Sequence, residues 1–213
     1  MRTKLIEINP DDPDPKALDI AADAIKAGKV VAAPSDTLYV LIADPFSLNA
    51  ISSAFRAKGR ERTRSLPILV DSMSMAEDYA APPLSPRFYL LARRFWPGPL
   101  TIIVPSSALL PLKVTGNTGR LAVRQSAAMV PNGLIGRLGT PVIATSANRT
   151  GSPTCRSGVE ALGSMDGRID LILDGGEVDA LGATTVDITE TEWKVIKEGA
   201  VSRAQLEDCL EAP

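Results

Sequence analysis

Residues 29–42 read KVVAAPSDTLYVLI and contain two short apolar runs separated by a polar turn. The first run, Lys29 to Ala33, ends at Pro34, and the second, Thr37 to Ile42, is rich in residues that favour strands. The tight turn Pro34-Ser35-Asp36 lies between the two runs. This stretch predicts two neighbouring strands with polar side chains where the first strand ends.

Helices are predicted on both sides of this stretch. Residues 16–27 have apolar side chains at helical spacing, with Pro15 suited to the first turn and Gly28 to the left-handed end. After the strands, Ser47 can cap a helix that ends near Gly59. Two later helices are predicted at 85–95 and 202–210, and further strands at 66–70, 100–104, 121–124, 142–145, 169–173, 185–188 and 193–197.

The order of these elements indicates the fold class. About eight short strands alternate with four to six helices, and helices between the early strands favour a partly parallel, twisted sheet. The close spacing of the last strands suggests antiparallel additions. With no repeat and no dividing linker, we expect an α/β (α+β) chain with an N-terminal lead at residues 1–15 and a single domain at residues 16–213.

The composition excludes several classes of chemistry. The 213 residues include no histidine, which removes the Ser-His-Asp and Cys-His nucleophile systems and every His-ligated metal site. The two cysteines, Cys155 and Cys209, cannot form a four-thiolate zinc site, so we expect no metal site on the protein. No apolar run approaches a membrane span and no signal-peptide pattern is present, which predicts a cytoplasmic protein.

Five cations lie within nine residues of a chain whose formal net charge is −2: Arg56, Lys58, Arg60, Arg62 and Arg64. Arginine offers forked donors and lysine a point charge, so the cluster can bind phosphate oxygens. A solvated basic turn after a helix explains the same residues, and both interpretations remain open.

Polar groups follow other apolar runs. Thr145-Ser146-Ala147-Asn148 places hydroxyls and an amide at the carboxyl end of a predicted strand, where ligands gather in open α/β sheets. Arg124 ends another strand and requires an ion-pair partner or a carboxylate or phosphate ligand. Asp36 either holds its turn or accepts from an amine. No G-x-x-x-x-G-K-[ST] loop is present, so a bound nucleotide needs another kind of site.

Seven short stretches, taken in order, resemble the YrdC family, the threonylcarbamoyl-AMP synthases that start the threonylcarbamoyl modification of the adenosine beside the tRNA anticodon. The resemblance runs from about Gly28 to Gly199. It rests on Pro34-Ser35-Asp36-Thr37-Leu38-Tyr39, Lys58-Gly59-Arg60, Phe95-Trp96-Pro97-Gly98-Pro99-Leu100-Thr101, Leu121-Ala122-Val123-Arg124, Thr145-Ser146-Ala147-Asn148 with Gly151, Asp174-Gly175-Gly176 and Thr184-Thr185-Val186.

The resemblance implies a YrdC-like twisted mixed sheet with flanking helices around a positively lined cavity, where ATP, bicarbonate and L-threonine meet and pyrophosphate leaves. It implies a catalytic set around the ATP phosphates and the nascent carbamate: Lys58, Arg60, Ser146 and Asn148. It places Ser35, Arg124, Ala144 and Thr184 on the threonine side, with Arg124 on the carboxylate. It places Arg62, Arg120, Thr154 and Lys197 beside the nucleotide. Charge on the phosphates is neutralised by Lys, Arg and Mg²⁺ in such transfers, and a tRNA threonylcarbamoyl transferase complex receives the product.

Several positions depart from the family pattern. Ser35 stands where the family usually has threonine, Val40 where it has glycine, and Lys197 where it has arginine. These departures leave open a divergent paralogue that binds or hydrolyses a carbamoyl-adenylate without making it. A third interpretation, from a different class, is an RNA-binding module that uses the basic cluster at 56–64, although a net charge of −2 argues against extensive RNA binding.

Overall fold

A computed structural model of the chain describes residues 2–61 and 63–211. Its strands are β1 (Lys4–Glu7), β2 (Val31–Pro34), β3 (Tyr39–Ala43), β4 (Ile68–Val70), β5 (Leu100–Pro105), β6 (Arg120–Gln125), β7 (Val142–Ser146), β8 (Leu171–Asp174), β9 (Thr184–Asp187) and β10 (Lys194–Lys197). Its helices are α1 (Pro15–Lys26), α2 (Leu48–Lys58), α3 (Met73–Tyr79), α4 (Pro86–Phe95), α5 (Leu112–Thr115), α6 (Met129–Leu138), α7 (Gly158–Met165) and α8 (Arg203–Glu211).

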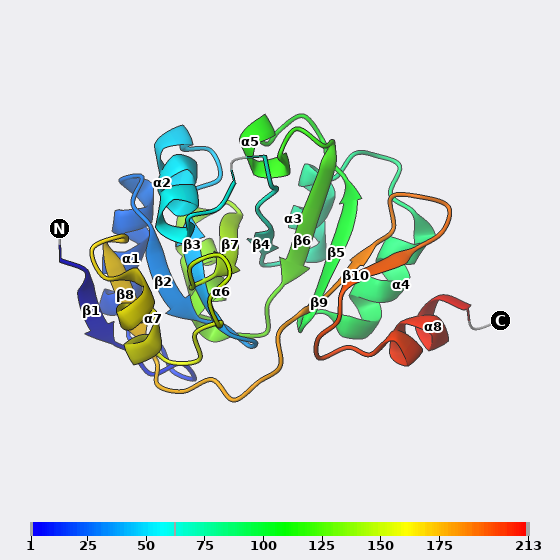
Figure 1. The fold of residues 1–213 in the computed structure, drawn as a ribbon. Helices are drawn as coiled ribbons and strands as arrows, with labels where there is room; N and C mark the ends of the chain where they lie inside the picture. Colours follow the sequence, from blue (N-terminus) through cyan, green and yellow to red (C-terminus); the bar gives the residue numbers. More distant parts are fainter. Residues whose placement is uncertain (1, 62, 212–213) are drawn as a thin grey trace.

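The strands form one mixed sheet in the order β1-β8-β2-β3-β7-β4-β6-β5-β9-β10 (Figure 1). Four neighbouring pairs are parallel, β1 with β8, β8 with β2, β4 with β6, and β5 with β9. The last two strands pair antiparallel, as their close spacing predicted. The expected twisted mixed sheet with flanking helices is confirmed.

The helix ends follow the local signals in the sequence. The side chain of Asp14 accepts hydrogen bonds from the amides of Lys16 and Ala17 at the start of α1, at 2.7 and 3.0 Å. Ser47 Oγ accepts from the Ala50 amide at 3.2 Å at the start of α2. The α2 helix ends at Gly59, whose φ of +59° is in the left-handed region that glycine tolerates best.

One strand was missed by the sequence interpretation. Residues 4–7 lie in the predicted N-terminal lead, but they form β1 and pair with β8 in register from Lys4 opposite Leu171 to Glu7 opposite Asp174. The stretch KLIE has no apolar run, and its pairing partner lies more than 160 positions away along the chain. The strand therefore depends on a long-range pairing that local sequence patterns do not report.

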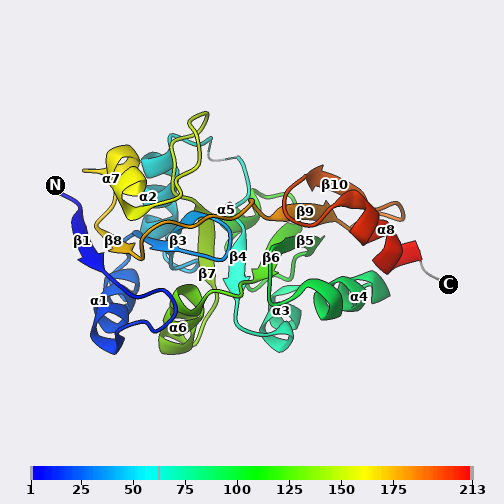
Figure 2. The same cartoon turned by 90° about the horizontal axis from the view of Figure 1, so that it is seen from below.

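The sheet separates two apolar cores, because successive side chains on a strand point to opposite faces. Val31 and Ala33 pack in the core beneath α1 and α6, whereas Ala32, Tyr39 and Leu41 pack in the core that includes α2 and α7. Figure 2 shows α1 and α6 on one side of this half of the sheet and α2 and α7 on the other. The other half, around β5 and β9, is covered by α4, which packs with α8.

Gly199 brings the end of β10 close to the start of β9. A Cβ atom at Gly199 would lie directly against the carbonyl oxygen of Gly182 and 2.8 Å from the Thr184 nitrogen. The Ala200 amide donates to the same Gly182 oxygen at 2.9 Å. All of these neighbours are backbone atoms, so a side chain at position 199 forces this part of the sheet to shift.

We expect Gly199→Ala to lower the free energy of unfolding by about 1–3 kcal/mol, the range for overpacked sites. Urea denaturation followed by circular dichroism measures the change. The matched control is Gly163→Ala in α7, where a Cβ would meet nothing within 4 Å and where alanine should stabilise the helix by about 0.5–1 kcal/mol. Equal unfolding free energies for the two variants would contradict the close approach at Gly199.

Candidate active site

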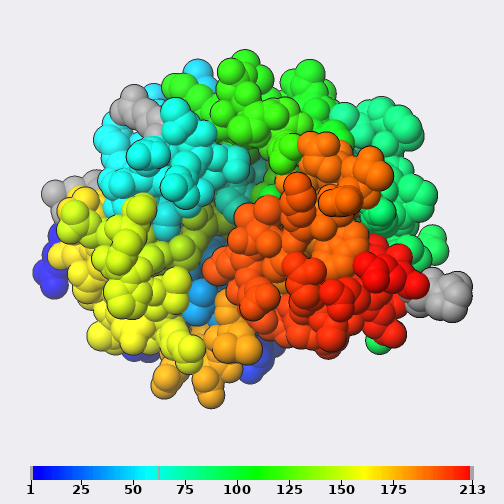
Figure 3. Space-filling model, turned by 45° about the vertical axis from the view of Figure 1, so that its right-hand side comes forward, coloured from blue at the N-terminus to red at the C-terminus, as the bar shows by residue number. Residues whose placement is uncertain are grey.

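A cavity of about 240 Å³ opens in the middle of the sheet. Figure 3 shows the hollow between the cyan and yellow surface on one side and the orange surface that includes β9 and β10 on the other. Its lining is mixed apolar, hydroxyl and basic: Thr37, Leu38, Val40, Arg60, Pro67, Leu69, Thr101, Arg124, Ala144, Thr145, Ser146, Ala183, Thr185 and Lys197. The cavity therefore combines three cations with several hydroxyls.

Arg124 lies near the end of β6 and lines this cavity. Its side chain is 5% exposed, and its Nη1 lies 3.2 and 3.3 Å from the two carboxylate oxygens of Asp36. Burial lowers the pKa of Arg124, and the neighbouring Asp36 carboxylate opposes that shift. The sequence left open an ion pair or a substrate contact, and the structure places an ion-paired arginine in the cavity wall.

Lys58, the last residue of α2, is joined to Ser146 and Asn148, so three members of the expected catalytic set lie together. The lysine is only 3% exposed. Its Nζ donates to Ser146 Oγ at 3.2 Å, to the Asn148 carbonyl at 2.9 Å and to Asn148 Oδ1 at 3.3 Å, and also to the Ser146 carbonyl. All four acceptors are neutral, so the ammonium has no carboxylate partner among these contacts.

The electrostatics of Lys58 follow from this position. Burial, followed by the nearby charge of Arg60, lowers the pKa of Lys58 to about 8. Burial removes the water that stabilises a charged ammonium, and a nearby positive charge also disfavours the charged form. Both effects lower the pKa of the lysine. A bound anion would reverse both effects by supplying negative charge beside the ammonium.

Arg60, the fourth member of the expected set, follows α2 and lines the cavity. Its Nη2 donates to the Ser65 carbonyl at 3.0 Å, whereas its buried Nε has no hydrogen-bond partner among the described residues. Burial lowers the pKa of Arg60, and Arg64 adds to that effect. An unpaired buried donor is costly, and a phosphate oxygen would satisfy it.

Of the other residues implied for the threonine side, one lines the cavity and two lie behind its wall. Ala144 lines the cavity. Ser35 and Thr184 are buried and use their hydroxyls on the backbone: Ser35 donates to the Leu38 carbonyl at 2.6 Å, and Thr184 donates to the Val201 carbonyl at 2.6 Å. Their hydroxyls hold the chain around the site, and neither residue is among those that line the cavity.

The residues implied for the nucleotide are also divided. Lys197 lines the cavity and a neighbouring pocket of about 480 Å³, and Thr154 lines that second pocket. Arg120 lies away from both, in ion pairs with Asp187 at 2.8 Å and Glu190 at 2.6 Å. Arg62 lies outside the described residues. The structure therefore brings Lys197 and Thr154 together and leaves Arg120 at a separate pocket.

Sequence reasoning missed three residues of the site, two in the cavity and one in the second pocket. Thr101 and Thr185 line the cavity, although no role was assigned to either. Thr185 neighbours Thr184 on β9, and of the two only Thr185 is among the lining residues, whereas the Thr184 hydroxyl donates to the Val201 carbonyl. Arg156 lines the second pocket beside Thr154 and was also missed. A pair of adjacent threonines was the available signal, but sequence does not say which one faces inward.

The four described cations of the basic cluster at 56–64 do not form one continuous surface. Lys58 is buried, Arg60 lines the cavity, and Arg56 and Arg64 are exposed. Within residues 2–61 and 63–211, no group of three or more acidic, cysteine or histidine side chains is arranged to hold a metal ion. No helix in the same part of the chain is both long enough and apolar enough to cross a membrane.

Comparison with known proteins finds relatives that all belong to one family. The sequence model of the Sua5_yciO_yrdC family, described as telomere recombination, matches residues 23–199. A threonylcarbamoyl-AMP synthase of Pyrococcus abyssi is 35% identical over 90% of this chain and 56% of its own length. One from Xanthomonas campestris is 34% identical over 83% of this chain and 92% of its own length.

Solved structures agree with the sequence relatives. The crystal structure of P. abyssi Sua5 complexed with L-threonine has a TM-score of 0.93 at 33% identity, covering 98% of this chain and 61% of that one. E. coli YciO shares the fold, with a TM-score of 0.87 at 22% identity over 96% of this chain and 99% of its own. The chain thus spans little more than half the length of the Pyrococcus protein.

Proposed function

The chain belongs to the Sua5/YciO/YrdC family, and from that premise we propose that it is a nucleotidyltransferase that makes L-threonylcarbamoyl-AMP. Its substrates are L-threonine, bicarbonate and ATP, and pyrophosphate is released. The reaction is the first step of the threonylcarbamoyladenosine modification of tRNA. The proposal joins the family membership to the chemistry of the cavity.

One observation carries the proposal: Arg60, Arg124 and Lys197 converge on a single cavity of about 240 Å³. An amino-acid carboxylate and the phosphates of ATP are the anionic groups that such a convergence suits. The cavity is smaller than the ~300–1,000 Å³ typical of whole-ligand pockets. The neighbouring pocket, which shares Leu38 and Lys197 with the cavity, adds about 480 Å³ for the nucleoside.

Each side chain has a role in this proposal. Arg124 binds the threonine carboxylate, with Ala144 beside the substrate, and Ser35 and Thr184 hold the backbone around it. Arg60 and Ser146 line the cavity and face the triphosphate. Lys58 is buried behind Ser146 and is not among the lining residues, so it supplies its charge from beneath the wall, where Asn148 fixes it. Thr154 and Lys197 flank the nucleotide.

The reaction needs no protein nucleophile, which suits a chain without histidine. The neutral threonine amine attacks carbon dioxide derived from bicarbonate, loses a proton and becomes a carbamate. A carbamate oxygen then forms a bond to the α-phosphorus of ATP, and the bond to the β-phosphate breaks to release pyrophosphate. The protein aligns the reactants and stabilises charge on the phosphates.

Magnesium fits this site only as part of the nucleotide substrate. Mg²⁺ is bound in such enzymes through substrate phosphates and water with few protein carboxylates, and the described residues offer no carboxylate cluster for it. We therefore assign Mg²⁺ to the ATP phosphates, whose charge it neutralises together with Lys58 and Arg60.

The proposal is tested by pyrophosphate release from ATP in the presence of bicarbonate and Mg²⁺. We expect release to depend on L-threonine, with threonylcarbamoyl-AMP identified by mass spectrometry. D-threonine serves as the control. As the mirror image, it cannot place its carboxylate, amine and side chain together in the three positions that L-threonine occupies. Folded protein that binds ATP but releases no pyrophosphate with L-threonine would refute the synthase proposal.

ATP affinity should depend on the charge of Lys58, whose pKa is lowered to about 8. The ammonium is present below that pH and is lost as the pH rises through it, so ATP should bind more weakly above pH 8, by up to about tenfold per pH unit. Calorimetric titration without threonine, from pH 7 to 9.5, measures this without interference from the substrate amine. Lys58→Gln should give a flat profile. An ATP affinity that does not change with pH in the unmodified protein would contradict the role of Lys58 in ATP binding.

A second candidate is a divergent paralogue that hydrolyses a carbamoyl-adenylate without making it. The observation in its favour is Val40, whose side chain lines the cavity opposite Ser146 in the β3–β7 register. A β-branched residue there narrows the space beside the phosphate-binding groups. Hydrolysis of preformed threonylcarbamoyl-AMP in the absence of threonine-dependent pyrophosphate release would favour this candidate.

The proposed product also determines the partner and the location. A carbamoyl-adenylate is a mixed anhydride that hydrolyses readily, so a transferase acting on tRNA must take it up quickly. We propose a tRNA threonylcarbamoyl transferase complex as the partner and the cytoplasm as the location. We propose at most weak direct RNA binding by this chain, since the described cations of the basic cluster at 56–64 are divided between the buried site and the surface.

A further inference from the structure

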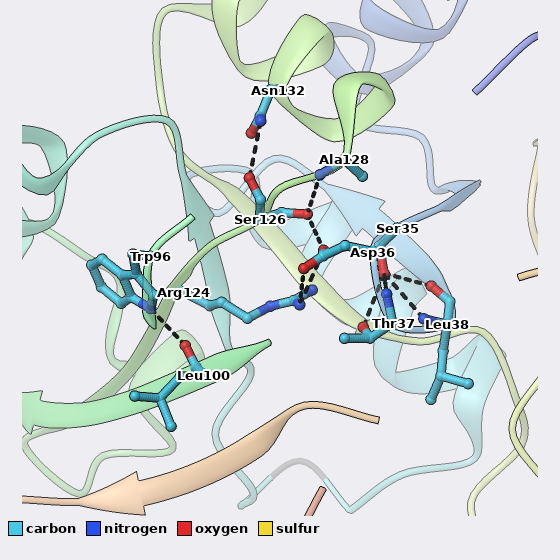
Figure 4. A network of polar contacts seen from close by, with 10 residues as sticks. All are labelled: Ser35, Asp36, Thr37, Leu38, Trp96, Leu100, Arg124, Ser126, Ala128 and Asn132. Atoms are coloured by element: carbon cyan, nitrogen blue, oxygen red, sulfur yellow. Dashed lines mark hydrogen bonds and ion pairs between the residues drawn. The ribbon is translucent and has the colours of Figure 1, made fainter. Parts of the chain in front are cut away.

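Asp36 and Ser126 form a chain of polar contacts behind Arg124 (Figure 4). Asp36 lies in the turn between β2 and β3, Arg124 on β6, and Ser126 just after β6. Asp36 accepts from Arg124 and from the Ser126 hydroxyl. Neither Asp36 nor Ser126 lines the cavity, whereas Arg124 does.

The contact uses only part of the guanidinium. A single nitrogen of Arg124, Nη1, approaches both oxygens of Asp36, at 3.2 and 3.3 Å. This differs from a forked pair, in which two nitrogens meet two oxygens. Among the described residues, no acceptor is hydrogen-bonded to Nε or Nη2 of Arg124. These donors are therefore left for a ligand in the cavity.

The turn that holds Asp36 is built to keep it in place. Ser35 Oγ accepts from the amides of Thr37 and Leu38, both at 3.2 Å, and donates to the Leu38 carbonyl at 2.6 Å. Ser35 is only 5% exposed, so these hydrogen bonds do not compete with water. Asp36 is thus presented from an ordered turn rather than from a mobile loop.

Ser126 is oriented toward Asp36 by its other contacts. Its side chain is fully buried, and its Oγ accepts from the Ala128 amide at 3.2 Å. Since that lone pair is occupied, the hydroxyl proton is directed to the Asp36 carboxylate. The Asn132 side chain of α6 donates to the Ser126 carbonyl at 3.0 Å, which ties the arrangement to the helix.

We propose that Asp36 is a positioning residue for the amino-acid substrate: it holds Arg124 by Nη1 so that the remaining guanidinium donors meet the substrate carboxylate, and Ser126 holds Asp36. This inference rests on the proposed function, in which Arg124 binds the threonine carboxylate. In this proposal Asp36 and Ser126 set the conformation of Arg124, although neither of them touches the substrate. It also predicts that threonine binding is more sensitive to Asp36 than ATP binding is.

The alternative role for Asp36 is simple charge neutralisation of a buried arginine. The two roles predict opposite results. If Asp36 only neutralises Arg124, its removal leaves a stronger positive charge and L-threonine binds more tightly. If Asp36 positions Arg124, its removal frees the guanidinium to rotate and L-threonine binds more weakly.

The test is calorimetric binding of L-threonine and, separately, of ATP to Asp36→Asn, Ser126→Ala and the unmodified protein. For Asp36→Asn we expect threonine affinity to fall at least about tenfold, the effect of one charge-assisted hydrogen bond, with ATP affinity within about twofold of its original value. Ser126→Ala should weaken threonine binding less. Asp19→Asn, which removes the exposed partner of Arg137, is the matched control and should change neither affinity.

The outcomes separate this inference from the proposed function. Unchanged or tighter threonine binding by folded Asp36→Asn would overturn the positioning role, as would equal losses for threonine and ATP. Ser126→Ala keeps the test possible if Asp36→Asn does not fold, because unchanged threonine binding in Ser126→Ala then counts against the proposal. Protein that binds threonine but releases no pyrophosphate would refute the synthase proposal and still allow the Asp36 comparison.

Discussion

Replacing Lys58 with methionine is expected to reduce threonine-dependent pyrophosphate release at least about a hundredfold, the usual cost of removing one group that stabilises charge on a reacting centre. Methionine keeps much of the length and packing of the side chain but has no charge and no donor. Four hydrogen bonds to Ser146 and Asn148 are lost together. The substitution therefore removes the positive charge beside the ATP phosphates and also the contacts that hold the loop after β7.

Steady-state kinetics with ATP as the varied substrate measures the effect, and most of the loss should lie in kcat/KM for ATP. Arg56→Met is the matched control, since Arg56 lies on the same helix, carries the same charge and is exposed. We expect its rate to stay within about twofold of the original, as for most surface substitutions. A Lys58→Met rate similar to that of the control would remove Lys58 from the site.

Arg124→Lys is expected to raise the KM for L-threonine by about 10- to 100-fold, because lysine offers a point charge where arginine offers several fixed donors. Lysine is chosen over alanine for a physical reason. Alanine would leave the Asp36 carboxylate, whose side chain is 13% exposed, without its partner, and breaking a buried pair costs about 3–5 kcal/mol of stability. The lysine variant retains charge beside Asp36 and isolates the effect on substrate.

The matched control is Arg137→Lys on α6, a second ion-paired arginine whose partner is Asp19. Its KM values should not change. If Arg124→Lys raised the KM values for ATP and L-threonine equally, the defect would be in the whole site, and Arg124 would lose its assignment to the carboxylate. Thermal unfolding of both variants shows whether either substitution has damaged the fold.

The elements that local signals specify were predictable. Asp14 and Ser47 cap helices through contacts within three residues, and Gly59 ends α2 with a conformation that its own lack of a Cβ permits. The β2–β3 stretch has the continuous apolar runs of strands buried on both faces, and it forms the two neighbouring strands that were predicted, which pair antiparallel. The motif order placed Lys58, Ser146 and Asn148 in one site, and the structure brings these side chains into contact.

Arg120 and Arg124 show why the rest could not be predicted. Both lie on β6 at even spacing, so both face the same side of the sheet, yet four residues of strand separate their Cα atoms by about 13 Å. Arg124 lines the cavity, and Arg120 pairs with Asp187 and Glu190 at the other end of the strand. Their surroundings come from segments distant in sequence.

By itself, the sequence determined the ends of α1, α2, α4 and α8, the strand pattern after β1, the absence of histidine chemistry and the set of polar groups available to the site. Only the tertiary structure decided that β1 pairs with β8, that Thr185 rather than Thr184 faces the cavity, and that Asp36 pairs with Arg124. The physical reason is the range of the interactions. Caps and strand alternation depend on neighbours a few residues away, whereas cavity walls and ion pairs depend on how the sheet brings distant strands together.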